Sequence, residues 1–176
     1  MPAFLDAILR SSSLPNLHPA VVHFPIALLV VAPLLDLVSL ALRGRAGFRH
    51  AGVIVWVLAA VSAGGAFWSG ERAEAHVAIT DPTAMADLEA HADAALWTAW
   101  GAAIGTVVRL ALALGGRRRP ALGTAGAALG VVCGLALVAM VARTADRGGR
   151  LVYRHGVGVS AAAEELVPAA TPPPVF

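Results

Sequence analysis

The sequence predicts an all-α, polytopic membrane protein that folds as a four-helix bundle. Hydrophobic residues make up 58% of its 176 residues and charged residues only 14%, whereas an ordinary soluble domain has about 25% charged residues. Four apolar stretches reach the roughly 20 residues that a helix needs to cross about 30 Å of hydrocarbon. None shows the period-two alternation of a membrane β-strand, so helices are expected. The predicted spans are residues 19–42, 51–70, 94–114 and 120–142.

The segment before the first span is expected to stay on the protein and to lie in the membrane interface. Residues 1–18 lack the basic start of a secretory signal. Apolar residues gather on one face of their first ten positions, which predicts a short amphipathic interfacial helix. Farther along, Asp81 followed by Pro82 has the pattern of a helix N-cap, so the third helix is expected to begin well outside the bilayer.

Residues 148–176 are predicted to form an external C-terminal segment. Gly148 and Gly149 permit a sharp turn, and the following Leu-Val-Tyr at 151–153 favours extended structure. Such a segment is expected to fold back over the ends of the helices and to bring His155 toward them. The last ten residues are rich in proline and predict a flexible tail.

Arginines distinguish the two sides of the membrane. The two short connectors between spans each carry three arginines, and the longer connector between the second and third spans is acidic. The positive-inside rule then places the short connectors in the cytoplasm and both termini on the other side. The arginines concerned are Arg43, Arg45, Arg49, Arg117, Arg118 and Arg119.

Five of the six histidines fall on the predicted outer side of the membrane. His23 lies inside the first apolar run, where a polar side chain costs free energy and marks a functional position. His91 lies on the third helix, a turn beyond its apolar core. Paired imidazoles from facing helices hold haem b in membrane cytochromes, so we expect His23 and His91 to bind a haem iron or a comparable redox metal. The five are His18, His23, His76, His91 and His155.

Two alternatives remain for these histidines. Copper or another metal would need three or four ligands, and His18, His76 and His155 would supply the additional ones. In the other alternative no cofactor is bound, and His23 only hydrogen-bonds the carbonyl of Val21, which loses its amide partner because Pro25 has no N–H.

Two charged residues and a set of glycines lie within the spans. Asp36 lies six residues before Leu42 and Arg109 six residues before Gly115, so the two charges stand at matching depths. Each charge alone would cost several kcal/mol in hydrocarbon, so an interhelical ion pair is expected. Glycines recur every fourth residue on the third and fourth spans and predict close helix packing. They are Gly101 and Gly105 on the third span, and Gly126, Gly130 and Gly134 on the fourth.

Two motifs give the chain a family resemblance. The first runs from Leu17-His18-Pro19 to Val22-His23-Phe24-Pro25-Ile26, and the second from Gly149-Arg150-Leu151-Val152-Tyr153 to His155-Gly156-Val157-Gly158-Val159. With them, residues 14 to 160 resemble a widespread bacterial family of four-helix membrane proteins catalogued as a domain of unknown function. Some members are joined to Rieske iron–sulfur or cytochrome c domains. The resemblance therefore implies an electron-transfer setting, with haem b held by the motif histidines.

The sequence thus predicts a redox module of the bacterial inner membrane. Its expected partners are the lipid bilayer, quinone, and a Rieske or cytochrome c protein or a larger respiratory or photosynthetic complex. The alternative is a non-catalytic accessory subunit that packs against such a complex. A transporter fits less well, because no broken helix pair suggests a midplane site. No nucleic-acid signature occurs.

The arginine connectors yield a topology prediction. A reporter that is active only outside the cytoplasm should be active when fused after Phe176 and silent when inserted at Gly116, because the positive-inside rule places these points on opposite sides. Reporter activity in cells expressing each fusion at equal level measures this. The reverse pattern would place the histidines on the cytoplasmic side.

Overall fold

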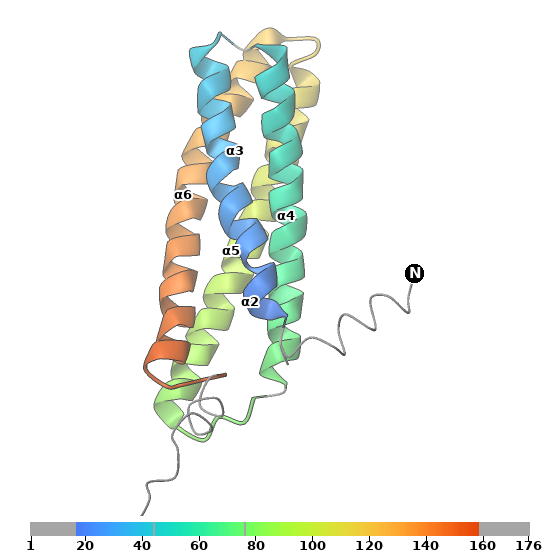
Figure 1. Cartoon of the computed structure of the whole chain (residues 1–176). Coiled ribbons are helices and arrows are strands. Elements are labelled where there is room, and N and C mark those ends of the chain that lie inside the picture. Colours follow the sequence, from blue (N-terminus) through green and yellow to red (C-terminus); the bar gives the residue numbers. More distant parts are fainter. Residues whose placement is uncertain (1–16, 44, 76, 159–176) are drawn as a thin grey trace, which may run out of the picture.

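The computed structural model describes residues 17–43, 45–75 and 77–158 as an up-and-down bundle of four long helices, preceded by one short helical turn (Figure 1). Going around the bundle, α3 packs against α4, α4 against α5, α5 against α6, and α6 against α3. The short helix α2 packs against α4. The elements are α2 (His18–Val21), α3 (His23–Ala41), α4 (Ala46–Glu74), α5 (Pro82–Gly115) and α6 (Pro120–Tyr153).

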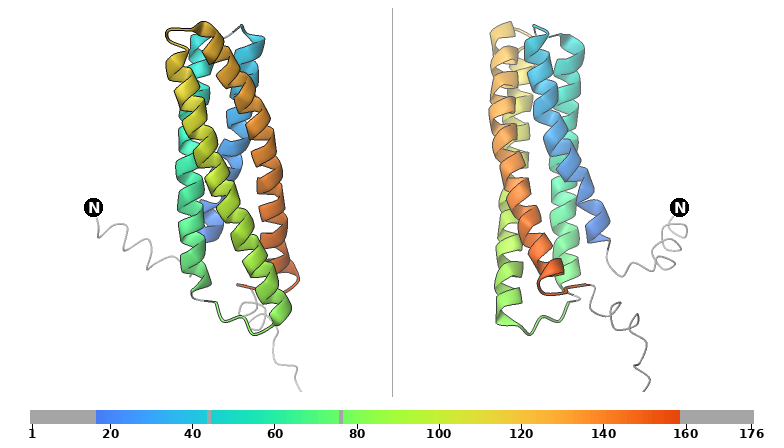
Figure 2. Two further views of the ribbon diagram at one scale, coloured as in Figure 1. Left: turned by 180° about the vertical axis from the view of Figure 1, so that it is seen from behind. Right: turned by 60° about the vertical axis from the view of Figure 1, so that its left-hand side comes forward.

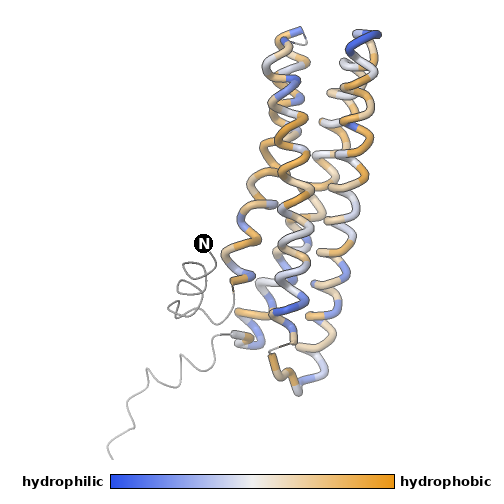
Figure 3. The backbone as a smooth tube through the Cα atoms, turned by 90° about the vertical axis from the view of Figure 1, so that its right-hand side faces the viewer, coloured by the Kyte–Doolittle hydropathy of each residue, from blue (hydrophilic) through white to orange (hydrophobic). Residues whose placement is uncertain are grey.

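Four helical stretches are long and apolar enough to cross a membrane, as the sequence predicts. They are α2 with α3, then α4, α5 and α6. In Figure 3 the middle of the bundle is coloured mainly orange, for hydrophobic residues, and hydrophilic residues, in blue, gather toward its ends. At 1.5 Å per residue, a helix the length of α5 or α6 spans about 50 Å, which exceeds the roughly 30 Å of hydrocarbon. Both helices therefore extend beyond the apolar layer.

The two ends of the bundle differ in their chemistry. The α3–α4 and α5–α6 connectors lie together at one end, and α2 and the α4–α5 connector lie toward the other (Figures 1 and 2). We call the first the arginine end, because it carries the two clusters of arginines, and the second the histidine end, because His18 and His91 lie toward it. The interfacial helix expected at residues 1–18 lies outside the described residues, apart from Leu17 and His18.

The ends of α5 and α2 follow from local sequence. The Asp81 side chain accepts a hydrogen bond of 2.9 Å from the backbone amide of Thr83 and so caps α5, as expected, with Pro82 in its first turn. Between α2 and α3 the helix is interrupted at Val22. This interruption lies where Pro25, which has no N–H, leaves a backbone carbonyl without its usual helical partner.

The expected turn at Gly148-Gly149 and the extended segment after it are wrong, because α6 continues as a helix to Tyr153. A salt bridge of 2.9 Å between Asp146 and Arg150, four residues apart, supports the helix across the glycines. The turn comes later, at Gly156, whose φ of 64° lies in the left-handed region that glycine adopts without strain. There the amides of Gly156 and Val157 donate to carbonyls of the last helical turn.

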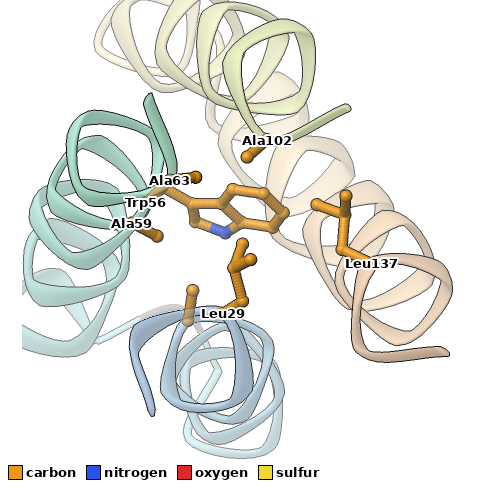
Figure 4. Packing of buried hydrophobic residues seen from close by; sticks show 7 residues of the cluster. Leu29, Trp56, Ala59, Ala63, Ala102 and Leu137 are labelled. Carbon is orange, nitrogen blue, oxygen red and sulfur yellow. The ribbon is translucent and has the colours of Figure 1, made fainter. Parts of the chain in front are cut away.

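A tryptophan fills the centre of the bundle. Trp56 projects from α4 into the space between all four long helices and contacts the cluster shown in Figure 4. Its neighbours are mainly alanines, which bring the helices close around the large indole ring. The indole N–H donates a hydrogen bond of 2.8 Å to Asp36 on α3, so the polar group of the tryptophan is satisfied inside the apolar core. The labelled cluster comprises Leu29, Trp56, Ala59, Ala63, Ala102 and Leu137.

The two charges within the spans meet next to this tryptophan. Asp36 and Arg109 form a salt bridge of 2.7 Å between Oδ1 and Nη2, with side chains only 0% and 1% exposed. Nε of Arg109 also donates to both carboxylate oxygens, at 3.1 and 3.2 Å. The hydroxyl of Thr106, one turn before Arg109, donates to the backbone carbonyl of Trp56 at 2.9 Å. This polar group therefore joins α3, α4 and α5 inside the bundle.

The fourth helix makes room for the ion pair with glycine. A Cβ atom at Gly130 would overlap the carboxylate of Asp36, and one at Gly126 would lie 2.8 Å from Leu112 and 3.4 Å from Nη1 of Arg109. At Gly134 a Cβ would collide with Pro33 of α3. The small residues of α6 thus accept side chains from α3 and α5, which is the close packing that their spacing predicts.

The ion pair leads to a stability prediction. Asp36→Asn and Arg109→Met should each lower the free energy of unfolding by about 3 kcal/mol, because each leaves a buried charge without its partner. The double variant contains neither charge and should lose less than the sum of the two. Unfolding in detergent followed by circular dichroism measures all three. Additive losses would show that the two charges do not stabilise each other.

A second prediction concerns the glycine beside the pair. Gly130→Ala should lower the free energy of unfolding by about 2 kcal/mol, because the added methyl group displaces the Asp36 carboxylate from a packed core. Gly65→Ala on α4 is the matched control, since a Cβ there meets nothing within 4 Å. The same detergent unfolding assay compares the two. Equal effects would mean that Gly130 matters only as a flexible helical residue.

Candidate metal centre

Two histidines far apart in sequence come together at the histidine end. His18 begins α2, and His91 lies in the third turn of α5. Their ring centroids are 6.5 Å apart and the ring planes are nearly perpendicular, at 83°. The pairing depends on α2 packing against α4, because this contact holds His18 at the side of the bundle where α5 passes.

A backbone carbonyl fixes the orientation of the His91 ring. Nδ1 of His91 lies 2.9 Å from the carbonyl oxygen of Thr144 on α6. A carbonyl only accepts hydrogen bonds, so Nδ1 carries the proton in the neutral ring and Nε2 carries the lone pair. Nε2 is therefore the nitrogen of His91 that is able to bind a metal.

A serine orients the His18 ring in the same sense. Nδ1 of His18 lies 2.9 Å from the hydroxyl oxygen of Ser69 on α4. That hydroxyl donates its single proton to the carbonyl of Ala66 at 2.8 Å, so toward His18 the oxygen acts as an acceptor. Nδ1 of His18 is then the protonated nitrogen, and the two rings share one tautomer.

A glycine lies against each ring. A Cβ atom at Gly70 on α4 would be 3.0 Å from Cε1 of His18, and one at Gly148 on α6 would be 3.0 Å from Cε1 of His91. Real Cβ contacts are rarely so short, so both positions favour glycine while the rings stay in place. Gly148 therefore leaves space beside α6 for the His91 ring. This glycine serves helix packing and does not form the turn that the sequence predicts.

Polar contacts between α5 and α6 hold the His91 side of the site. Nη1 of Arg147 donates to the carbonyl of Ala90 at 2.7 Å. The hydroxyls of Thr98 and Thr144 lie 3.3 Å apart, but each donates its single proton to a carbonyl of its own helix, that of Ala94 and that of Met140. The Arg147 bond and the bond from His91 to Thr144 are therefore the hydrogen bonds that tie α5 to α6 around His91.

His23 does not take the position that the sequence suggested for it. Its side chain is exposed at the start of α3, and the histidine that faces His91 is His18. The physical reason is helix geometry, because the two histidines are five residues apart on a stretch that keeps helical dihedral angles at Val22, and about 100° of rotation per residue turns their side chains to different sides. The expected His23–His91 pair is therefore replaced by a His18–His91 pair.

His155 lies near the pair but faces carboxylates. Its Nε2 is 3.0 Å from Asp87, and its Nδ1 is 3.6 Å from Asp81. Asp87 precedes His91 by four residues on α5, so His155 lies about one helical turn from the His18–His91 pair. Hydrogen bonds from the backbone amide and the hydroxyl of Thr83 lower the pKa of Asp81 below its usual value, so Asp81 is charged at neutral pH.

The described residues offer two ligands at this site. Within residues 17–43, 45–75 and 77–158, no three or more His, Cys, Asp or Glu side chains are placed to hold one metal ion. The larger ligand set that copper or zinc would need from His18, His76 and His155 is therefore not assembled among these residues. His76, which the sequence also suggested, lies outside the described residues.

The sequence does not predict the role of several residues at this site. Ser69 and Thr144 orient the two rings, yet each is one of many hydroxyl residues in apolar helices, and no pattern marks it. Asp81 and Asp87 gave a helix-start signal but no sign that they would bind His155. Gly70 and Gly148 were visible as glycines, and only the position of the rings explains them.

Comparison with known proteins places the chain in a family without supplying an activity. No curated protein and no solved structure matches the sequence significantly. A family profile described as "Predicted membrane protein (DUF2231)" matches residues 14–161, which contain the helices α2 to α6. The chain is therefore a member of this family of membrane proteins, DUF2231.

Proposed function

We propose that this protein is a membrane electron-transfer module in which His18 and His91 would hold a haem b group. The observation that carries the proposal is the distance of 6.5 Å between the two ring centroids. Two imidazoles on opposite sides of one metal ion, with metal–nitrogen bonds of about 2.0 Å, have ring centres roughly 6 Å apart. The separation of the two ring centroids is therefore compatible with one metal held between the rings.

The hydrogen bonds around the rings support this proposal. In metal sites, a ligating histidine commonly donates its other ring N–H to a carbonyl or a carboxylate, which fixes the tautomer and the direction of the ring. Thr144 does this for His91 through its carbonyl, and Ser69 does it for His18 through a hydroxyl that is itself held by Ala66. Both rings are held in advance with Nε2 as the lone-pair nitrogen.

The number of ligands favours haem over copper or zinc. Haem b needs only two axial ligands from the protein, and paired histidines from facing helices are a common solution in membrane bundles. When bound, haem b would supply one-electron transfer. The role of the chain itself is to hold the haem and to orient the two histidine rings. Gly70 and Gly148 let the rings lie close to α4 and α6, and Arg147 joins α5 to α6 beside His91.

We also propose the orientation that the arginines predict. The arginine end would face the cytoplasm and the histidine end the outer side of the bacterial inner membrane, because six arginines lie in or beside the two short connectors. The histidine pair would then face a Rieske or cytochrome c protein outside the membrane. Electrons would pass between that carrier and the haem at this end of the bundle.

A spectrum of the purified protein tests the haem site. Protein isolated from its native membrane should show sharp α and Soret bands when reduced, together with about one iron per site. His18→Ala and His91→Ala should each abolish or broaden these bands, because each removes one axial imidazole. Absorption spectra and elemental analysis measure both effects.

Two other histidines serve as controls. His23→Ala and His50→Ala should leave the spectrum unchanged, since His23 is exposed on α3 and His50 lies toward the arginine end. Loss of the bands with His23→Ala alone would move the ligand from α2 to α3. A colourless protein without stoichiometric iron or copper would end the redox proposal and favour an accessory subunit of a larger membrane complex.

A further inference from the structure

Six arginines give the arginine end a positive charge that no carboxylate of the described residues neutralises. The sequence has no Asp or Glu between residues 36 and 71, nor between residues 93 and 146. Asp36, the acidic residue nearest to this end along the chain, already binds Arg109 inside the bundle. Within the described parts of the chain, no salt bridge joins an acid to any of the six, which are Arg43, Arg45, Arg49, Arg117, Arg118 and Arg119.

The six arginines form one surface, although they belong to different connectors and helices. The α3–α4 and α5–α6 connectors lie together at this end of the bundle (Figures 1 and 2). Arg49 on α4 connects the two groups, because its Nη1 would lie only 3.2 Å from a Cβ atom at Gly123 on α6. Arg49 is half-buried in this position, and the other five arginines are exposed. We call the six together the arginine surface.

Exposed leucines place the arginine surface at the edge of the hydrocarbon layer. Leu42 comes directly before Arg43, and Leu114 lies in the last turn of α5, three residues before Arg117; both leucines are exposed. Apolar side chains exposed at the end of a membrane-spanning helix contact acyl chains, and the long arginine side chains beside them carry their charges into the headgroup layer. The guanidinium groups therefore lie at the depth of the lipid phosphates.

We propose that the arginine surface binds the headgroups of anionic phospholipids, of which phosphatidylglycerol is the simplest probe. Its phosphodiester carries a negative charge at the depth of the guanidinium groups. Clusters of about four to eight basic residues beside a membrane span are typical of sites for anionic lipids. This inference does not rest on the proposed haem site, because the arginine surface and the histidine pair lie at opposite ends of the bundle.

The exposed leucines favour a lipid over a soluble anion. Free phosphate or an acidic protein would approach the arginines from water and would leave Leu42 and Leu114 without a partner. A phospholipid brings acyl chains to these leucines and a phosphate to the arginines at the same time. A zwitterionic phospholipid does so too, but it adds an ammonium group that the positive surface repels. Anionic lipids should therefore gather at this end in preference to zwitterionic ones.

Electron spin resonance of spin-labelled lipids tests this preference. The protein is reconstituted in phosphatidylcholine vesicles that contain a trace of spin-labelled phosphatidylglycerol or of phosphatidylcholine labelled on the same carbon. The motionally restricted fraction of each label gives its relative association with the protein. Phosphatidylglycerol should associate about threefold more strongly than phosphatidylcholine. Raised ionic strength should reduce this preference, because exposed charges are screened by salt.

Paired substitutions assign the preference to the arginine surface. Arg117→Gln together with Arg118→Gln should lower it to about half or less, because two charges near the phosphates are lost. Arg143→Gln together with Arg154→Gln is the matched control, since both arginines are exposed toward the histidine end, and it should keep the preference of the parent. Arg117→Lys together with Arg118→Lys retains the charge and should also keep it.

Four outcomes would overturn the inference. The two labelled lipids could associate equally, the glutamine pair could lose no more preference than its control, or the lysine pair could lose as much as the glutamine pair. The fourth outcome concerns the source of the anion. Inorganic phosphate and chloride at equal ionic strength should lower the preference equally, because both act by screening. A greater loss with phosphate would mean that the surface is a site for free phosphate.

Discussion

The ion pair between Asp36 and Arg109 is the constraint on which the rest of the bundle depends. Two opposite charges in an apolar core are tolerated only when each binds the other closely, because either alone is costly to bury. The contact fixes the register of α3 against α5, and the Trp56 hydrogen bond adds α4 to the same point. Glycines at 126 and 130 then let α6 close over the pair. All four long helices are positioned by one polar group.

The middle of the bundle and its histidine end are held together by different interactions. The core around Trp56 is built from alanine and glycine with few large side chains, so the helices stay close and leave little internal space. Toward the histidine end, α5 and α6 extend beyond the apolar layer, and side-chain bonds to backbone carbonyls take over from apolar packing. The bundle thus has an apolar, closely packed middle and a polar end, and the histidine pair belongs to the polar end.

Much of the fold could be predicted from the sequence because the bilayer restricts the choice. A long apolar segment in lipid has to satisfy its own backbone, so the four spans and their helical state follow from composition alone. The cap of α5 at Asp81 is equally local. Gly148-Gly149 misled the prediction, because a helix is also able to use glycine to admit a neighbouring ring, and only the packing of His91 distinguishes that use from a turn.

For the candidate site too, one part could be predicted from the sequence and another part could not. By itself the sequence determined that histidines gather toward one end and that Asp36 and Arg109 stand at matching depth, since both follow from counting residues along helices. Only the tertiary structure decided that His18, rather than His23, meets His91, and that Ser69 and Thr144 orient the two rings. The reason is that the packing of α2 on α4 and of α6 on α5 is set by contacts between distant residues, which no local pattern records.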